Sequence, residues 1–218
     1  MDTKVLNQQS QQWESNFSRK PEMFGLEPST PAKKALKIFK NNKTNKIVEL
    51  GAGLGRDSIY FAKNSIHVEA LDYSQSGIKN INQKIIKNNL SNLIKTKIFD
   101  VRKKLPFKNN SIEGIYSHML YCMALTTSDL ESLNKEIHRI LKPGGINIYT
   151  VRHTNDGDYK KGIHRGEDMY ENDGFIVHFF SKNKINSLMD GFINLELTNF
   201  EEGEFPRKLY FVCNKKNK

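Results

Sequence analysis

A run of glycines near residue 50 and an acid about 20 residues later have the types and spacing of a nucleotide site. Gly51–Gly55 follows the apolar segment 47–50 and contains three glycines, which let a backbone turn tightly and approach a ligand closely. Asp72 ends a second apolar segment 21 residues after Gly51. That spacing matches the offset of about 20 residues at which an acid in a βαβ unit reaches a ribose diol. These residues therefore predict a pocket in which a carboxylate accepts hydrogen bonds from two hydroxyls.

The spacing of the glycines restricts the kind of nucleotide. A dinucleotide fingerprint reads Gly-x-Gly-x-x-Gly, and Arg56 stands where its third glycine should be. The pyrophosphate cradle of a dinucleotide site is therefore incomplete. An ordinary strand-to-helix turn is the alternative to any nucleotide site, and the distant partner Asp72 argues against it.

Residues 49–55 read Glu-x-Gly-x-Gly-x-Gly and, with Asp72, resemble motif I and the next acidic position of the class I S-adenosylmethionine-dependent methyltransferases. The resemblance implies that the glycine turn passes under the methionine part of S-adenosyl-L-methionine. It also implies that Asp72 holds the ribose and that Asp100 approaches the adenine amine. The cofactor-binding residues that it implies are Glu49, Gly51, Ala52, Gly53, Gly55, Arg56, Asp57, Asp72, Tyr73, Ser74, Asp100, Val101, Ser117 and His118.

The chain after Asp72 alternates between helix and strand patterns. Ser74 is the predicted N-cap of an amphipathic helix, and strands are expected at Leu93–Phe99 and Ser111–Tyr116. The next amphipathic helix is expected to begin at Ser128 or Asp129. This alternation is typical of a parallel sheet covered by helices.

The end of that helix carries a second resemblance to the same family. Ile137–Gly145 ends in Lys-Pro-Gly-Gly and precedes the apolar segment Ile146–Val151, as at the junction of a helix with the fifth strand. Farther on, Ile193–Phe200 and Lys208–Cys213 suit an antiparallel pair. The sequence therefore predicts an α/β fold: a doubly wound Rossmann-like seven-stranded sheet with a C-terminal antiparallel hairpin and an N-terminal helical cap.

A single methyltransferase domain is expected over residues 1–218, because this length suits one doubly wound core with small additions. We divide it into an N-terminal cap segment (1–45), a cofactor-binding core (46–152), a lid insertion (153–180) and a C-terminal helix and hairpin (181–218). The lid insertion follows a central strand, and ligands of open α/β sheets bind beyond the ends of such strands.

The lid insertion is expected to be a long polar loop, and such loops often cover or bind a substrate. His153, His164 and Arg165 are predicted catalytic residues, since imidazole and guanidinium groups can hold an anionic acceptor. Each histidine has the alternative of a structural hydrogen-bonding role. The histidines and acids show neither an i, i+4 pair nor a tight chelate spacing, so no metal site is predicted.

The N-terminal segment resembles one branch of the family. Trp13–Phe17 and Met23–Ser29 look like the corresponding part of small-molecule methyltransferases of the tellurite-resistance and thiopurine type, in which this part folds over the cofactor. The alternative is that these side chains complete the core. In the tellurite-resistance type a Glu-Leu-His-Arg segment is associated with the acceptor, and Glu204–Arg207 is similar. The resemblance therefore implies that Arg207 is a fourth catalytic residue. Pro206 stands where that segment has its histidine, so His153 or His164 of the lid would have to replace it.

These resemblances predict methyl transfer from S-adenosyl-L-methionine to a small-molecule acceptor, preferably a thiol, chalcogen or metalloid species. Such nucleophiles need no strong base, which suits a site without an obvious pair of catalytic carboxylates. The alternatives are a small amine or carboxylate metabolite, RNA as the acceptor, or a non-catalytic protein that binds S-adenosyl-L-methionine. Cys122 could bind a soft acceptor, although a buried structural cysteine is the simpler interpretation.

Composition favours a cytoplasmic protein without nucleic-acid or membrane partners. The formal net charge is +10, but the lysines are scattered and form no basic face interleaved with aromatic residues. The chain has 2 cysteines, too few for a disulfide framework, and no apolar stretch approaches the roughly 18 residues of a membrane span. The first residues lack the apolar core of a signal peptide. The sequence carries no indication of the oligomeric state.

Overall fold

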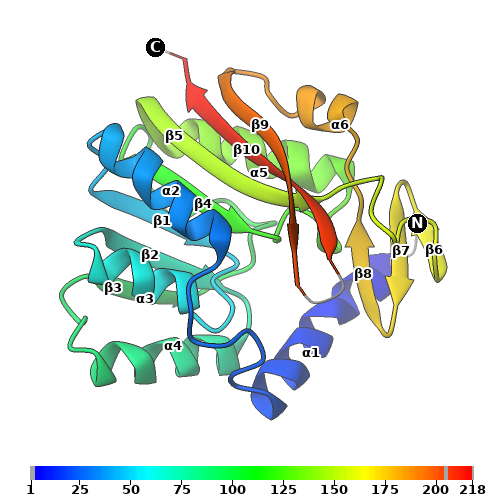
Figure 1. Ribbon diagram of the computed structural model, residues 1–218, viewed down its shortest axis with the longest axis horizontal. Coiled ribbons are helices and arrows are strands. Elements are labelled where there is room, and N and C mark those ends of the chain that lie inside the picture. Colours follow the sequence, from blue (N-terminus) through cyan, green and yellow to red (C-terminus); the bar gives the residue numbers. More distant parts are fainter. Residues whose placement is uncertain (1–2, 204–205, 218) are drawn as a thin grey trace.

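The computed structural model describes residues 3–203 and 206–217 and contains one large and one small sheet (Figure 1). Glu204 and Phe205, from the predicted acceptor segment, lie outside the described residues. The strands of the large sheet are β1 (Lys46–Leu50), β2 (His67–Asp72), β3 (Ile94–Ile98), β4 (Ile112–His118), β5 (Leu141–Arg152), β9 (Phe192–Glu202) and β10 (Arg207–Lys216). The strands of the small sheet are β6 (Ile163–Gly166), β7 (Met169–Asn172) and β8 (Phe175–His178).

The large sheet has the topology of a doubly wound fold. Its strand order is β3-β2-β1-β4-β5-β10-β9, with β1 to β5 parallel. β10 runs antiparallel between β5 and β9. The predicted seven-stranded sheet with a C-terminal antiparallel hairpin is therefore confirmed.

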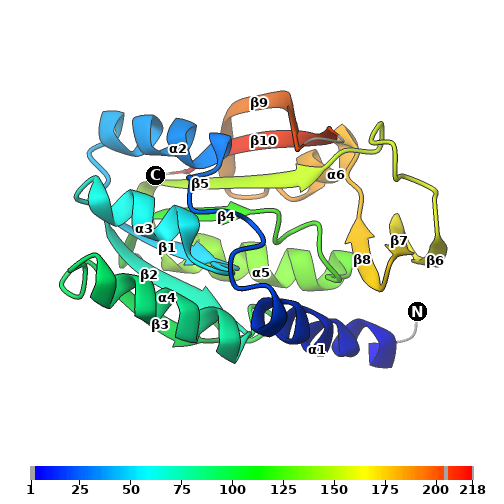
Figure 2. The ribbon, with the colours of Figure 1, turned by 60° about the horizontal axis from the view of Figure 1, so that its bottom comes forward.

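Helices cover both faces of the large sheet. They are α2 (Thr30–Asn41), α3 (Arg56–Lys63), α4 (Gln75–Lys87), α5 (Thr127–Ile140) and α6 (Lys182–Ser187), and α1 (Thr3–Arg19) lies beyond the end of the sheet (Figure 2). Apolar side chains of α2, α3 and α4 share one buried cluster with the strands. Those of α5 and α6 share the other. The two clusters put the core on both sides of the sheet, so ligand access is restricted to its ends.

The glycine turn between β1 and α3 needs backbone angles that favour glycine. Gly51, Gly53 and Gly55 have φ values of 71°, 55° and 79°. The turn is joined to the end of β2 because the amides of Gly51 and Ala52 both donate to the carbonyl of Leu71. A Cβ atom on Gly55 would lie 2.6 Å from Cγ1 of Ile81 in α4, so the turn also allows α4 to pack closely.

Several details differ from the sequence prediction. α5 begins at Thr127, because Thr126 and Asp129 form a capping box in which each side chain accepts from the other's backbone amide. β5 begins at Leu141, so Lys142–Gly145, expected at the junction before a strand at Ile146–Val151, belongs to the strand itself. The expected loop within 153–180 contains β6, β7 and β8, whose antiparallel pairing satisfies the backbone of this polar segment.

α1 and the small sheet lie together beyond the end of the large sheet to which β5 runs (Figure 2). Gln9 donates to the carbonyl of Gly174 at 2.9 Å and accepts from the amide of Ile176 at 3.0 Å. The Trp13 and Phe175 rings pack with their centroids 4.7 Å apart. The predicted helical cap is therefore present and is joined to the 153–180 segment. The division of the chain into four functional segments stays a prediction.

Replacing Gly55 with alanine is expected to destabilise the fold by about 1–3 kcal/mol, because the new Cβ meets Ile81 and the residue keeps a positive φ. Gly25→Ala is the matched control, since Gly25 also has a positive φ (69°) and nothing lies within 4 Å of a Cβ at that position. Urea unfolding of both variants measures the effect. Equal stability of the two variants would contradict the close approach of α4.

Candidate active site

Asp72 is the acid on which the predicted ribose contact depends. It ends β2 and is buried, and its Oδ2 accepts from the Gly53 amide while its Oδ1 accepts from the Ser74 amide, both at 2.8 Å. Burial raises the pKa of Asp72 to about 6, although these two hydrogen bonds act in the opposite direction. A carboxylate offers about four acceptor positions, so it can still accept from hydroxyl groups. The residues at this strand end therefore fit the ribose of S-adenosyl-L-methionine.

Glu49 and Asp57 already have buried protein partners. The hydroxyl of Ser58 donates to Glu49, and burial together with the charge of Asp57 raises the pKa of Glu49 well above its ordinary value. Asp57 accepts from the amide and hydroxyl of Ser29 at 2.8 and 2.7 Å and from the hydroxyl of Tyr116 at 3.0 Å. Asp57 thus joins the N-terminal segment to α3, and the cofactor contacts of both acids stay predictions.

Sequence reasoning did not select Glu14 of α1 as a site residue. Glu14 accepts from the hydroxyls of Ser74 and Ser76, both at 2.6 Å, and from the amide of Ser76 at 3.2 Å. Ser74 also caps α4, accepting from the amide of Gly77. Burial opposes ionisation of Glu14, but these hydrogen bonds lower its pKa. The carboxylate therefore holds α1 against the N-terminus of α4, directly after Asp72.

The predicted adenine end contains a second link to α1. Asp100 accepts from Nε and Nη2 of Arg102, and Nη1 of the same guanidinium donates to Asn7 at 2.6 Å. Tyr73 is partly buried beside these groups, and burial raises the pKa of its phenol, which stays a neutral donor. Val101 is buried in the core. The Asp100 contact with an adenine amine stays a prediction, and Arg102 is a partner that sequence reasoning missed.

Ser117 and His118 end β4 beside the glycine turn. The register pairs Glu49 with Tyr116, so His118 lies at the level of Gly51. The hydroxyl of Ser117 is buried without a hydrogen-bond partner among the described residues. Nδ1 of His118 lies 2.8 Å from the hydroxyl of Thr150 on β5. His118 therefore lies at the strand end where the predicted cofactor and acceptor regions meet.

Glu202, at the end of β9, is the main side chain here that sequence reasoning missed. Its Oε2 lies 3.1 Å from Nε2 of His118, and its Oε1 lies 3.8 Å from Nη2 of Arg56. Arg56 also donates to the carbonyl of Phe24 at 3.0 Å. The only sequence signal was the position of Glu202 just before the Glu204–Arg207 segment. Its link to residue 118 depends on the folding of the hairpin over the strand ends.

Aromatic side chains lie above the glycine turn. A Cβ on Gly53 would lie 3.6 Å from Phe17 and 3.9 Å from Phe24. Trp13 packs against Phe17, with ring centroids 5.4 Å apart, and also against the small sheet. These rings pack against one another and over the turn, and their role as a cover of the cofactor stays a prediction.

The four predicted catalytic residues lie in two places. His153 is buried, and its ring stacks on that of Tyr210 with the centroids 4.2 Å apart. Its Nδ1 accepts from the amide of Asn155. Its own amide donates to the carbonyl of Lys208 on β10, next to the exposed Arg207. Burial, with the charge of Lys208, lowers the pKa of His153. His164 and Arg165 lie on β6. Within residues 3–203 and 206–217, no hydrogen bond, ion pair or ring contact joins the two places.

The β6 residues have local partners. His164 is exposed, and its Nε2 lies 2.8 Å from the carbonyl of Glu167. The guanidinium of Arg165 binds the carboxylate of Glu171 on β7 at 2.6 Å. Both contacts stabilise the small sheet. Catalytic roles for His153, His164, Arg165 and Arg207 stay predictions.

Cys122 is a buried thiol rather than an exposed ligand. Its Sγ donates to the carbonyl of Met119 at 3.3 Å, and burial raises its pKa to about 11. The side chain therefore stays protonated near neutral pH. Over the described ranges, no three His, Cys, Asp or Glu side chains are grouped as they would be around a metal ion.

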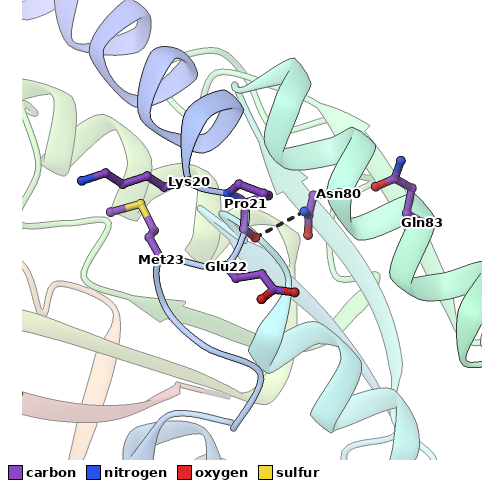
Figure 3. A pocket seen from close by; sticks show the side chains of 6 residues that line it. All are labelled: Lys20, Pro21, Glu22, Met23, Asn80 and Gln83. Atoms are coloured by element: carbon purple, nitrogen blue, oxygen red, sulfur yellow. Dashed lines mark hydrogen bonds between the residues drawn. The ribbon is translucent and has the colours of Figure 1, made fainter.

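A surface hollow of about 620 Å³ lies between the α1–α2 connection and α4 (Figure 3). Its lining residues are Lys20, Pro21, Glu22, Met23, Asn80 and Gln83. Asn80 donates to the carbonyl of Pro21 at 3.3 Å, a further link between this connection and α4. The lining includes none of the predicted site residues, so we assign the chemistry to the strand ends instead.

Comparisons with known proteins point to methyltransferases. Residues 47–145 match a family described as a methyltransferase domain. Phosphoethanolamine N-methyltransferase 1 of Triticum aestivum is 34% identical over 149 residues, which are 66% of this chain and 26% of the wheat protein. The matched part thus spans about a quarter of that relative. None of the helices within 3–203 and 206–217 has the length and apolar character to cross a membrane.

Two solved structures share the fold over most of this chain. TehB from Haemophilus influenzae superposes with a TM-score of 0.69 at 20% identity, covering 94% of this chain and 67% of its own. The 1,6-didemethyltoxoflavin-N1-methyltransferase of Burkholderia thailandensis gives 0.74 at 13% identity, covering 100% and 91%. At these identities the two likenesses show the fold alone.

Asp72→Ala is expected to weaken binding of S-adenosyl-L-methionine by about 1–3 kcal/mol, because the ribose hydroxyls lose their acceptor. Isothermal calorimetry measures the change. Glu69→Ala on the same strand is the control, since Glu69 pairs with Lys46 instead of the glycine turn. Unchanged affinity in a folded Asp72→Ala variant would place the ribose elsewhere.

Affinity for the cofactor is also expected to depend on pH through Asp72. The ionised carboxylate is the stronger acceptor and exists above the pKa of about 6, so affinity should fall as the pH falls through that value. Calorimetry between pH 5 and pH 8, as an approximate window around that pKa, measures this. Asp72→Ala should lack this step, and an identical pH profile in the variant would contradict the assignment.

Proposed function

Because the chain belongs to the class I S-adenosylmethionine-dependent methyltransferases, we propose that it transfers a methyl group from S-adenosyl-L-methionine to a small-molecule acceptor. The observation that carries this proposal is the position of Asp72, which is buried at the end of β2 and bonded to the glycine turn. When bound, the cofactor supplies an electrophilic methyl group on a sulfonium. The chain must align an acceptor with that group and exclude water.

The arrangement of α1 supports an enclosed site. Glu14 and Asn7 join this helix to residues beside Asp72 and Asp100, and Trp13 joins it to the small sheet. Such a cover favours a small acceptor over a polymer, because a long chain would have to displace it. RNA is therefore the less favoured acceptor, despite the charge of +10.

A thiol, chalcogen or metalloid species is the first acceptor class that we propose. It follows from the resemblance of both chain ends to the tellurite-resistance type. Arg207 begins β10 and is exposed at the hairpin end, where a guanidinium can attract an anionic acceptor. Cys122 is not proposed as a ligand, because its thiol is buried and protonated.

A small amine is the second class. The wheat relative is named as an N-methyltransferase, and this chain places the Glu202 carboxylate at the end of β4. A non-catalytic binding protein would share the cofactor contacts but would turn over neither class.

The test combines calorimetry with a mass-spectrometric methyl-transfer screen. S-adenosyl-L-methionine and its demethylated product are titrated into the full chain, and thiols, selenite, tellurite, arsenite, small amines and RNA are offered as acceptors. Cofactor binding with a methylated small molecule supports the proposal. Binding without any product supports the non-catalytic interpretation, and absence of binding contradicts both.

Arg207→Ala and Arg165→Ala are expected to lower turnover while the affinity for S-adenosyl-L-methionine stays unchanged, because both residues are predicted to act on the acceptor. Steady-state kinetics and calorimetry measure the two quantities separately. Lys63→Ala, an exposed residue at the end of α3, controls for the loss of a positive charge. Unchanged turnover in an arginine variant removes that residue from the acceptor side.

A further inference from the structure

We propose that the Glu202 carboxylate binds the acceptor: it accepts a hydrogen bond from the nitrogen of a small amine and stabilises the positive charge that this nitrogen gains. The inference rests on the proposed function and selects the amine from its two acceptor classes. It is carried by the position of Glu202 between His118 of β4 and Arg56 of α3.

The contacts of His118 fix the direction of the hydrogen bonds. Glu202 can only accept, so in the neutral imidazole Nε2 carries the proton and donates to Oε2 at 3.1 Å. Nδ1 then accepts from the hydroxyl of Thr150 at 2.8 Å, and this hydroxyl oxygen accepts from the amide of Met119 at 3.0 Å. Both ring nitrogens are occupied, so His118 positions the carboxylate and is not the base.

The backbone after His118 is constrained to keep this arrangement. Met119 has a φ of 61°, in the left-handed region that residues other than glycine rarely adopt. The turn lets its amide reach Thr150 while His118 stays at the level of Gly51. Backbone strain of this kind persists where surrounding contacts impose it, and it clusters at functional sites.

Glu202 is held as an anion and retains unused acceptor positions. Burial opposes its ionisation, but the hydrogen bond from His118 and the charges of Arg56 and Arg207 lower its pKa. Oε1 lies 3.8 Å from the Arg56 guanidinium, beyond hydrogen-bond distance. The side chain is 23% exposed, so a ligand can reach it.

An anion at this place suits the charge changes of N-methylation. Near neutral pH a small amine is mainly an ammonium, and it first loses a proton to solvent. The lone pair of the neutral amine then forms the new N–C bond, the C–S bond breaks, and its electron pair stays on the sulfur of the demethylated cofactor. The positive charge thereby moves from sulfur to nitrogen, which becomes an ammonium and later loses a proton to solvent. A carboxylate fixed beside the nitrogen stabilises that charge as it develops. The same carboxylate repels selenite, tellurite and other oxyanions.

The decisive experiment compares two acceptors of one shape in the wild-type chain and in Glu202→Gln. Ethanolamine and 2-mercaptoethanol differ only in the attacking group, and phosphoethanolamine and selenite extend the panel. Glutamine keeps an acceptor for His118 and removes the charge. We expect the wild-type chain to methylate the amines, and the variant to lose about 10- to 100-fold in kcat/KM for them. Glu201→Gln, a change of the exposed neighbouring residue, should leave kcat/KM for both the amines and 2-mercaptoethanol unchanged.

Two further measurements separate an acceptor role from a structural one. Calorimetry with ethanolamine on the chain saturated with demethylated cofactor should show weaker amine binding in Glu202→Gln, with unchanged affinity for S-adenosyl-L-methionine and unchanged melting temperature. Glu202→Asp should recover part of the amine activity, because it restores the charge.

The outcomes distinguish this inference from the proposed function. Methylation of 2-mercaptoethanol or selenite in preference to the amines would overturn the role of Glu202 while supporting methyl transfer. Amine activity that is equal in wild type and Glu202→Gln would also overturn it. Failure of the wild-type chain to bind S-adenosyl-L-methionine would contradict the proposed function itself. If Glu202→Gln does not fold, the acceptor preference of the wild-type chain alone decides the question.

Discussion

The hydrogen bonds of the Asp72 carboxylate are the interaction on which the rest of the site depends. One oxygen binds the amide of Gly53 and the other binds that of Ser74, so a single side chain joins the turn after β1 to the turn after β2. Burying that charge is costly, as its raised pKa of about 6 shows. The ribose contact and the geometry of both turns therefore depend on the same group.

Other acidic side chains join the segments that surround these two turns. Glu14 holds α1 at the start of α4, Asp57 holds the segment before α2, and Glu202 bridges β4 and α3. Each binds partners from a different part of the chain. The site is thus closed by ionic and hydrogen-bonded links around a small number of apolar contacts, and such links depend strongly on geometry.

The sequence predicted the parts of the molecule that depend on local pattern. The glycine turn, the acid after the second strand and the Lys-Pro-Gly-Gly junction are each contained in a short segment, and the seven-stranded sheet follows from their order. Glu14 and Glu202 were missed because their partners lie far away along the chain, and so was the contact of Arg102 with α1, although Asp100, its other partner, is a near neighbour in sequence. Asn7 and Arg102, for example, are 95 residues apart. The strands within 153–180 were missed because each is short, and β6 and β7 are also polar without a clear alternation.

The contacts of α1 have a consequence for synthesis. This helix is synthesised before its partners in the small sheet: Gln9 pairs with Gly174 and Ile176, which follow 165 and 167 residues later. Because synthesis proceeds at about 5–20 residues per second, these partners are made roughly 10–30 seconds after Gln9. The cofactor turn and its strands are complete well before that time. The contacts of α1 with the small sheet can therefore form only after the segments that contact the start of α4 have been synthesised.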